Sequence, residues 1–530
     1  MNGLQICGVR RDPSAKGSRN ALRRAVTAFA IAWVLSMVTA ISICAADITT
    51  AQWASLQKNA QAVVDAESQS SALPFAINTA LSGTGHRPYV FAHYFTPFPL
   101  SLDNLPARSD YYCTEYLSRS GEANKFASVG GYLRDRPLPL PRYSASAYRE
   151  RALAVEILRA SKIGIDGFGV DIMNLNSGAQ WDDVMRLYSV AEHVAPEFAI
   201  LAEPDMSALA GASVGDMVAA LRVIAGKKSA FRTAEGNLVV APFYAENVQS
   251  GYWADVIRDA AAAGVNVTLI PIFLDPNKAS DFRTITKDLS FWGVRTPSES
   301  TAKGGWEDQT LTMFESLGAD VMIPVAPQDV RPKESKFWEA LNSSLFRAQW
   351  SQVLNRSPAF VQIITWNDYS ESTHVAPSLG TQFTFYDLAA YYIQWAKSGQ
   401  PPPIVRDSIV YFHRRQIFMP GRSSTSETPM TNMGEGPVVN EIEMVGFLTA
   451  PGVMRITAGG TEYTSNAAAG LNVFRVSAVP GAPTFSILRN GVAVAQVTSN
   501  IPIVSLGSVQ DPLYIGGSST RSQVTLECSH

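Results

Sequence analysis

Cysteine is scarce in this chain, and its scarcity excludes a disulfide framework. The 530 residues include only 4 cysteines, and two of them, Cys7 and Cys44, fall in a leader segment at the N-terminus. Cys113 and Cys528 remain, and two cysteines so far apart do not form the closely spaced set of a disulfide-rich scaffold. Either they are separate thiols, or they pair because the tail of the chain folds back on the rest.

Histidine is almost as rare, and no spacing typical of a metal site is present. The 6 histidines form no HxH or HExxH pattern, and the cysteines form no CxxC pair. These spacings bring ligands together in most zinc sites. We therefore expect no metal and no other cofactor, and a metal-dependent hydrolase is disfavoured.

An excess of charge of one sign is lacking as well. Charged residues make up 17% of the chain, and the formal net charge is −3. Nucleic acids and anionic membrane surfaces are bound by clustered basic surfaces, so neither is expected as a partner. A neutral substrate fits better. The hydrophobic content of 46% is typical of a soluble globular protein, which we expect to be a monomer.

The first 46 residues have the pattern of a targeting segment. Basic residues between Arg10 and Arg24 precede the uncharged run Ala25–Ala46, and Cys44-Ala45-Ala46 offers small residues where a signal peptidase cleaves. Cleavage would place the mature start near Asp47 and the protein in a secreted or periplasmic location. Because the run is about long enough to span a bilayer, an uncleaved signal anchor is the alternative.

The central region alternates short apolar runs with helix-period segments. Eight runs rich in β-branched and aromatic residues occur in order: Pro88–Tyr94, Gly167–Ile172, Ala199–Leu201, Leu238–Phe243, Val267–Phe273, Leu289–Val294, Val321–Val325 and Phe360–Trp366. Among the helices expected near them is Lys336–Val353. Eight such units predict a (β/α)8 TIM barrel over residues 88–398, preceded by a helix and connector over 47–87. An open doubly wound sheet would carry a glycine-rich turn after the first strand, which is missing.

The pattern changes at the connector Gly399-Gln400-Pro401-Pro402-Pro403. Beyond it, residues 399–530 show short alternating strands separated by Gly, Pro, Asn and Ser, which predicts an all-β sandwich. This domain is either a carbohydrate-binding module or a structural sandwich packed on the barrel. No aromatic stripe stands out between Val453 and His530, which favours the structural alternative.

Acidic residues follow most of the predicted strands. In a barrel of this kind, chemistry takes place at the C-terminal ends of the strands. The acids there are Asp171, Glu203, Asp205, Glu246, Asp275, Asp329, Asp368 and Glu371, and aromatic residues such as Tyr94, Trp292 and Trp366 accompany them. Carboxylates that bind hydroxyls beside flat rings are typical of a sugar site. Asp166 precedes the second strand and is excluded, because it should lie at the opposite end.

The segment WNDYSES, Trp366–Ser372, supplies the candidate catalytic pair. Cleavage of a glycosidic bond needs one protonated acid and one ionised carboxylate, and Asp368 and Glu371 provide two carboxyl groups. An extended loop would separate them by about 10 Å and a helical turn by about 5–6 Å. The first distance suits inversion and the second is near the retaining geometry, so the spacing does not choose between them.

The last barrel strand closely resembles that of family 71 glycoside hydrolases, the α-1,3-glucanases or mutanases. The resemblance covers roughly residues 88–412. It rests on PAFVQIITWNDYSES at Pro358–Ser372, on Phe346-Arg347 and Trp350 before it, and on Val90–His93, Gly164–Phe168, Asp205-Met206 and Met322–Pro327. It implies an inverting, endo-acting hydrolase of α-1,3-glucan with Asp368 and Glu371 as the catalytic pair; we assign Glu371 as acid and Asp368 as base.

Around this pair we expect a set of substrate-binding side chains: His93, Tyr94, Asp171, Glu203, Asp205, Glu246, Trp366, Asn367 and Tyr369. For His93 the alternative is a buried histidine paired with a neighbouring carboxylate. Two positions depart from the family pattern, because Ser370 replaces the usual glycine and His374 lies one place late. The linkage therefore stays open, and two alternatives remain: an endo-α-mannosidase-like hydrolase and a non-catalytic glycan-binding barrel.

Overall fold

The structure is a computed structural model. It describes residues 48–69, 73–78, 81, 87–144, 146–301 and 304–528, all of which belong to one compact unit. The predicted targeting segment, residues 1–46, lies outside the described residues. No helix within the described ranges is long and apolar enough to cross a membrane.

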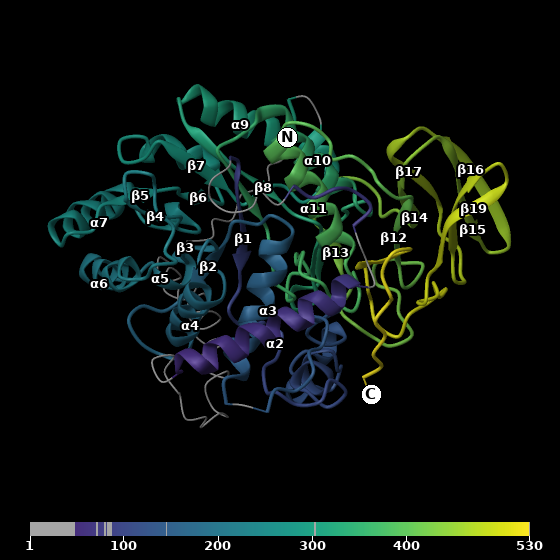
Figure 1. Cartoon of the computed structure of the whole chain (residues 1–530), viewed down its shortest axis with the longest axis horizontal. Coiled ribbons are helices and arrows are strands. Elements are labelled where there is room, and N and C mark those ends of the chain that lie inside the picture. The colour runs from purple at the N-terminus through teal and green to yellow at the C-terminus, as the bar shows by residue number, and fades with distance from the viewer. Residues whose placement is uncertain are drawn as a thin grey trace, which may run out of the picture. The chain divides into compact units, whose positions relative to one another are not determined.

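A parallel sheet forms the centre of the molecule, as Figure 1 shows. Its strands are β1 (Tyr89–Tyr94), β2 (Gly167–Ile172), β3 (Ala199–Pro204), β4 (Leu238–Val240), β5 (Val267–Leu269), β6 (Ile272–Phe273), β7 (Asp288–Phe291), β8 (Asp320–Val325) and β11 (Phe360–Ile363). The order is β5-β4-β3-β2-β1-β11-β8-β7-β6. Since β5 and β6 are consecutive in the chain, separated only by Ile270 and Pro271, they are two halves of one strand. The sheet therefore closes on itself, and the eight-stranded barrel is confirmed.

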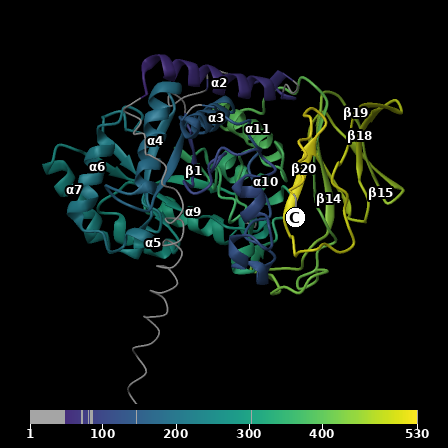
Figure 2. The ribbon, with the colours of Figure 1, turned by 90° about the horizontal axis from the view of Figure 1, so that it is seen from below.

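Helices connect the strands and cover the outside of the barrel (Figure 1). They are α3 (Tyr148–Lys162), α4 (Ala179–Val194), α5 (Met206–Leu209), α6 (Val214–Ala225), α7 (Ser250–Ala262), α8 (Pro297–Thr301), α9 (Trp306–Ser316), α10 (Ser344–Arg356) and α11 (Thr384–Ser398). Short helical turns are η3 (Tyr112–Tyr116), η4 (Glu122–Asn124), η5 (Ala127–Val129), η6 (Ala245–Asn247), η7 (Pro276–Phe282) and η8 (Pro332–Glu334). Helix α2 (Thr50–Gln69) packs across α3 and α4, as Figure 2 shows from a second side.

One predicted helix is wrong over nearly half of its length. Residues Lys336–Val353 were expected to be helical, but Lys336–Trp338 is strand β10 and α10 begins only at Ser344. Strand β10 pairs with β9 (Asp329–Arg331) as a hairpin inserted after β8. Aromatic and β-branched residues such as Phe337 suit this pleated surface better than a helix.

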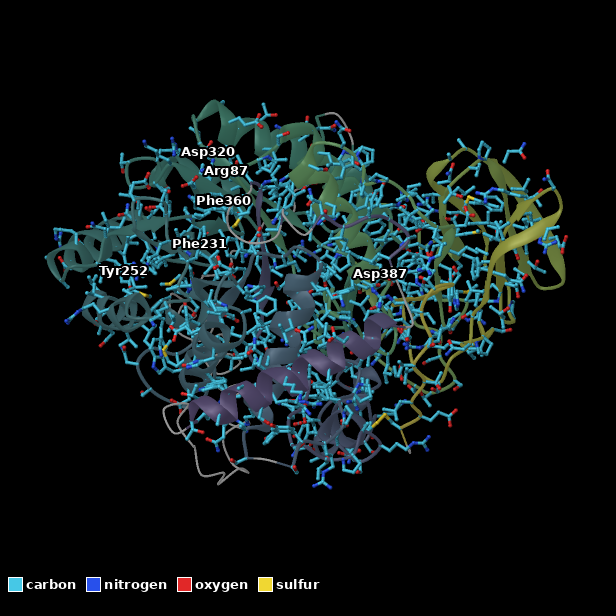
Figure 3. The ribbon with its side chains drawn as sticks, in the orientation of Figure 1. Arg87, Phe231, Tyr252, Asp320, Phe360 and Asp387 are labelled. Atoms are coloured by element: carbon cyan, nitrogen blue, oxygen red, sulfur yellow. A yellow bond between two sulfur atoms is a disulfide. The ribbon has the colours of Figure 1, made fainter. Side chains whose placement is uncertain are left out.

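Side chains alternate between the inside and the outside of the barrel. On β1, Phe91 joins the inner cluster with Leu201 and Met322, whereas Tyr94 packs in the outer layer against the helices. The inner cluster is apolar toward the N-terminal ends of the strands. Figure 3 labels Phe231 and Phe360, which belong to it. Toward the C-terminal ends the inward side chains become polar and charged.

The C-terminal region forms the predicted sandwich of two antiparallel sheets. One has the order β17-β14-β12-β20 and the other β16-β15-β18-β19. Their bounds are β12 (Ser408–Arg414), β14 (Glu441–Leu448), β15 (Gly452–Ala458), β16 (Thr461–Ala467), β17 (Gly470–Ser477), β18 (Thr484–Arg489), β19 (Val492–Thr498) and β20 (Tyr514–Ser518). The first sheet packs on the barrel, with the rings of Phe412 and Phe385 5.0 Å apart.

Two further contacts tie the C-terminal region to the barrel. Strand β13 (Thr431–Asn432) pairs with β10, so a segment from beyond the barrel completes the sheet β13-β10-β9. Cys113 and Cys528 form a disulfide that links η3, in the loop after β1, to the C-terminal tail. Of the two alternatives that the sequence left open, the structure therefore has the pair.

Candidate active site

A hydrogen-bonded cluster fills the C-terminal end of the barrel. His93 Nδ1 lies 2.6 Å from Glu203 Oε2, and Gln362 Nε2 donates to Glu203 Oε1 at 2.6 Å. The three side chains come from β1, β3 and β11 and point inward at the same level. Gly169 on β2 leaves the space for this carboxylate, because a Cβ there would overlap Glu203 Oε1. A larger residue at Gly169 would displace Glu203.

Two more carboxyl groups lie beside this cluster. Asp171 is the last residue but one of β2 and is only 4% exposed, and its Oδ1 has no hydrogen-bond partner among the described residues. Burial, together with the charges of Asp205, Glu203 and Asp368, raises its pKa well above the ordinary value, although His93 opposes this shift. Asp205 caps α5 by accepting a bond from Ser207 N at 2.8 Å. Burial and the neighbouring carboxylates thus favour the protonated form of Asp171, and its Oδ1 is left to bond a ligand.

The charge of His93 follows from its neighbours. Burial lowers the pKa of His93, but the bond to Glu203 and the charges of Glu203, Asp171 and Asp368 outweigh it and raise the pKa from 6.5 to about 9. The imidazole is thus a cation at neutral pH, paired with Glu203. This is the carboxylate-paired histidine that the sequence analysis kept as an alternative.

The segment after β11 forms a tight turn and presents Asp368. Asp368 Oδ1 accepts bonds from Ser370 N at 2.8 Å, Ser370 Oγ at 2.7 Å and Glu371 N at 3.0 Å. Such side-chain bonds to the backbone one turn ahead are typical of an aspartate that nucleates a turn. Three donors on one oxygen fix the orientation of the carboxylate, and no donor among the described residues bonds to Oδ2.

Glu371 lies on the same turn in a different environment. Its side chain is 20% exposed, and its Oε1 is 2.9 Å from Arg331 NH1. Burial raises the pKa of Glu371 from 4.5 to about 8; Arg331 and Arg295 lower it, whereas Asp368 and Asp329 raise it. One turn therefore carries two carboxyl groups with different surroundings, which is the usual way in which an acid and a base are separated.

The arginines near Glu371 were missed in the sequence. Arg331 and Arg295 both bond to Asp329, whose side chain is fully buried. Asp329 was recognised as an acid at a strand end, but Arg331 belongs to the β9–β10 hairpin that was predicted as helix and loop. Had the hairpin been recognised, the i, i+2 spacing of Asp329 and Arg331 on one strand would have placed Arg331 beside this acid. No sequence pattern points to Arg295.

Aromatic rings border the cluster. Trp292, just after β7, contacts His93 edge to face with ring centroids 5.0 Å apart, and Phe243 lies 4.5 Å from Trp292. On the other side, Tyr132 from the loop after β1 lies near the turn: burial and the charge of Asp368 raise its pKa above the ordinary value. Partly exposed rings beside carboxylates are suited to binding the apolar faces of sugars.

Two of the predicted substrate-binding residues point away from this site. Tyr94 and Trp366 lie in the layer between the strands and α3, where Tyr94 OH donates to Glu156 Oε2 at 2.7 Å and Trp366 Nε1 to Glu156 Oε1 at 3.3 Å. The cause is the alternation along β1: because His93 faces inward, Tyr94 faces outward. Neither side chain bonds to the cluster, so we correct both assignments to packing residues.

The side chains of Asn367 and Tyr369 are also taken up by contacts within the protein. The Asn367 amide bonds to Phe95 N at 2.7 Å, to Phe95 O at 2.9 Å and to Phe98 O at 3.0 Å, which fixes the loop after β1. Tyr369 is buried in an aromatic cluster with Phe98 and Tyr112. Both residues flank Asp368 in sequence, but the structure assigns them to support of the turn and its neighbouring loop.

Glu246 lies beyond β4 and orders a neighbouring loop. Its Oε1 accepts bonds from Leu274 N at 2.8 Å and Asp275 N at 2.6 Å. Its Oε2 is buried without a partner among the described residues, and burial raises its pKa. Of the predicted set, the structure thus brings together His93, Asp171, Glu203, Asp205, Asp368 and Glu371, with Glu246 on the same rim.

A barrel with buried carboxylates and aromatic rings at the C-terminal ends of its strands is typical of enzymes that process sugars. Residues 143–510 match the model of glycosyl hydrolase family 71, and the chain belongs to this family. It is a glycoside hydrolase.

Three known proteins are similar to this chain. A glucan endo-1,3-alpha-glucosidase of Schizosaccharomyces pombe is 23% identical over 397 residues, which cover 71% of this chain and 91% of that protein. A mutanase of Penicillium rubens is 24% identical over 362 residues, with coverages of 64% and 78%. Among solved structures, a GH99 endo-alpha-mannosidase from Bacteroides thetaiotaomicron is 12% identical, with a TM-score of 0.45 and coverages of 59% and 98%.

Proposed function

We propose that this chain hydrolyses α-1,3-glucan, with Glu371 as general acid and Asp368 as general base. The observation that carries the assignment is the turn after β11, which presents both carboxyl groups in unequal environments. Two relatives support the substrate, since one is a glucan endo-1,3-alpha-glucosidase and the other a mutanase.

The reaction divides between the two groups. Glu371, with its pKa raised to about 8, is protonated at neutral pH and donates its proton to the glycosidic oxygen as the bond from C1 to that oxygen breaks. A water molecule attacks C1 from the opposite face, and Asp368 Oδ2 accepts the proton that the water loses. The product has inverted anomeric configuration, and solvent returns the proton to Glu371.

The remaining polar groups bind the sugar. Protonated Asp171 donates to a hydroxyl oxygen, and Asp205 and Glu246 accept from hydroxyl groups at the rim. His93 carries a positive charge close to Asp368 and Asp171, so it reduces the electrostatic repulsion between the neighbouring carboxyl groups. Trp292 contacts the apolar face of the bound ring.

We further propose that the enzyme is endo-acting, monomeric and exported. Export rests on the basic segment and the uncharged run Ala25–Ala46 at the N-terminus. Endo action is supported by the relatives, which include an ascus wall endo-1,3-alpha-glucanase of Schizosaccharomyces pombe that is 23% identical.

The experiment is product analysis on a substrate panel. Purified protein is incubated with insoluble α-1,3-glucan, with α-1,4-glucan and with α-1,6-mannan, and released sugars are identified while NMR follows their anomeric configuration. We expect β-configured oligosaccharides from α-1,3-glucan only. Release from mannan alone would support the mannosidase alternative, and binding of α-1,3-glucan without any release would support the glycan-binding barrel.

A further inference from the structure

An inserted hairpin delivers an arginine to the proposed acid. The chain does not pass directly from β8 to its helix but forms the β9–β10 hairpin first, and Arg331 is the last residue of β9. Its NH1 lies 2.9 Å from Glu371 Oε1. This is the cation that contacts the carboxyl group directly.

The guanidinium of Arg331 is held in one orientation. Its Nε and NH2 donate to the two oxygens of Asp329 at 2.8 and 2.7 Å, and the group lies 5.1 Å from the centre of the Trp338 ring. A two-point bond to a carboxylate fixes the plane of a guanidinium, which a single contact does not. Only the remaining nitrogen, NH1, is directed at Glu371.

Asp329 in turn is shared between two cations. Arg295 Nε donates to Asp329 Oδ2 at 3.0 Å, and Arg295 NH1 donates to Trp292 O at 2.8 Å. The negative charge of Asp329 therefore offsets part of the positive charge that Arg331 presents to Glu371. A carboxyl group beside an uncompensated arginine would be driven to its ionised form.

Backbone bonds hold the hairpin against the turn and against the C-terminal region. Val330 N donates to Glu371 O at 2.7 Å, and Ser372 Oγ donates to Val330 O at 3.0 Å. On the other edge, Thr431 N donates to Ser335 O at 2.8 Å. The C-terminal region thus supports the element that carries Arg331.

We propose that Arg331 and Asp329 are positioning residues: Arg331 orients the Glu371 carboxyl, and Asp329 holds Arg331 in place and moderates its charge, so that the pair sets the pH range of hydrolysis. The inference rests on the proposed function of Glu371 as the acid. The two residues then shift the pH range of hydrolysis in opposite directions.

The opposite directions follow from the groups that face Glu371. These are Arg331 and Asp329 from β9, Arg295 from the segment after β7, Asp368 from the same turn, and Tyr132 from the loop after β1. Arg331 lowers the pKa of Glu371 and Asp329 raises it. A general acid must be protonated, so kcat/KM falls as the pH rises through this pKa.

The test is the pH profile of kcat/KM on soluble α-1,3-glucan oligosaccharides for the full chain. In Arg331→Gln the alkaline limb should move to higher pH by roughly one unit, and in Asp329→Asn to lower pH by a similar amount. Arg331→Lys keeps the charge but not the two-point bond, so its limb should stay near the wild-type position while kcat falls. Arg489→Gln, which removes an arginine paired with Asp407 in the sandwich, is the matched control and should move nothing.

Glu371→Gln distinguishes a failure of the proposed acid role of Glu371 from a failure of the positioning role of Arg331 and Asp329. If this variant keeps full activity with an unchanged limb, Glu371 is not the acid and the proposed function fails. If it loses activity but the limbs of Arg331→Gln and Asp329→Asn coincide with the wild-type limb, the proposed function stands and the positioning role is wrong. Thermal melting of each variant checks folding. If Arg331→Gln does not fold, the two single variants Arg331→Lys and Asp329→Asn still test the positioning role.

Discussion

The two ends of the barrel treat buried acids in opposite ways, and β2 carries an example of each. Asp166, just before this strand, is fully paired: Lys397 Nζ lies 2.6 and 2.7 Å from its oxygens, and Val90 N donates at 2.7 Å. Asp171, at the other end of β2, keeps a buried oxygen without a partner. An unpaired buried carboxyl group costs stability, so its presence marks the end at which a ligand supplies the missing bond.

One cavity lies at the other end of the barrel. A cavity of about 350 Å³ opens near the N-terminal ends of the strands, lined by residues that include Tyr89, Phe231 and Lys228. Asp171 and Glu246, which each keep a buried carboxyl oxygen without a partner among the described residues, do not line it. The cavity and these two carboxyl groups therefore lie in different parts of the barrel.

The largest expected effect is on catalysis at the C-terminal end. Glu371→Gln removes the proton donor, so kcat on α-1,3-glucan should fall by about 10²- to 10⁴-fold. An aryl glycoside whose leaving group needs no proton should lose much less. Comparing steady-state rates on both substrates checks this; an equal loss on both would contradict the role of Glu371 as acid.

At the N-terminal end the expected loss is in stability instead. Lys397→Met leaves Asp166 buried without its cation, which should lower the free energy of unfolding by about 3–5 kcal/mol. The kcat at a temperature where the variant is folded should stay within about twofold of the wild type, since the pair is remote from the turn. Denaturant melts and rates measured on the same preparation provide the check. A large fall in kcat with unchanged stability would erase the distinction between the two ends.

The His93–Glu203 pair predicts a pH dependence of stability. The pKa of His93 in the folded protein is about 9 and lies above its ordinary value of 6.5. Its contribution, about 3 kcal/mol, is therefore fully present below pH 6.5 and is lost as the pH rises through 9. In Glu203→Gln this loss should vanish. Unfolding free energies of both proteins between pH 6 and 10 test this, and parallel pH profiles would contradict it.

The disulfide between η3 and the tail is expected to contribute to stability by an amount similar to that of His93. Reduction, or the double substitution Cys113→Ser and Cys528→Ser, should lower the free energy of unfolding by about 2–4 kcal/mol. Since η3 packs beside the aromatic cluster of Tyr112 and Tyr369, activity on the polymer should fall more than activity on a short oligosaccharide. Equal stability of the reduced and oxidised protein would show that the tail is held by its other contacts.

The sequence allowed the barrel and the sandwich to be predicted because each depends on local patterns. Alternating apolar runs marked the eight strands, whereas the spacing of Asp368 and Glu371 left an extended loop and a helical turn both open. The outward direction of Tyr94 also follows from alternation once His93 is known to face inward.

The features that the sequence did not allow to be predicted depend on contacts between segments that are distant along the chain. Arg331 reaches Glu371 only because an inserted hairpin folds over the turn, and strand β13, about a hundred residues further along, completes its sheet. The partner of Cys113 lies at the far end of the chain. The hydrogen bonds of Asn367 to Phe95 and Phe98 likewise join segments that sequence spacing does not connect.

The same substitution at the two ends of the barrel tests whether the turn after β11 carries catalysis and the opposite end carries stability. Asp368→Asn and Asp166→Asn are compared for kcat on α-1,3-glucan and for free energy of unfolding. The account predicts that Asp368→Asn loses about 10²-fold or more in kcat while its stability changes little, and that Asp166→Asn loses stability and keeps its kcat. Hydrolysis by Asp368→Asn at the wild-type rate would contradict the assignment of catalysis to the turn after β11.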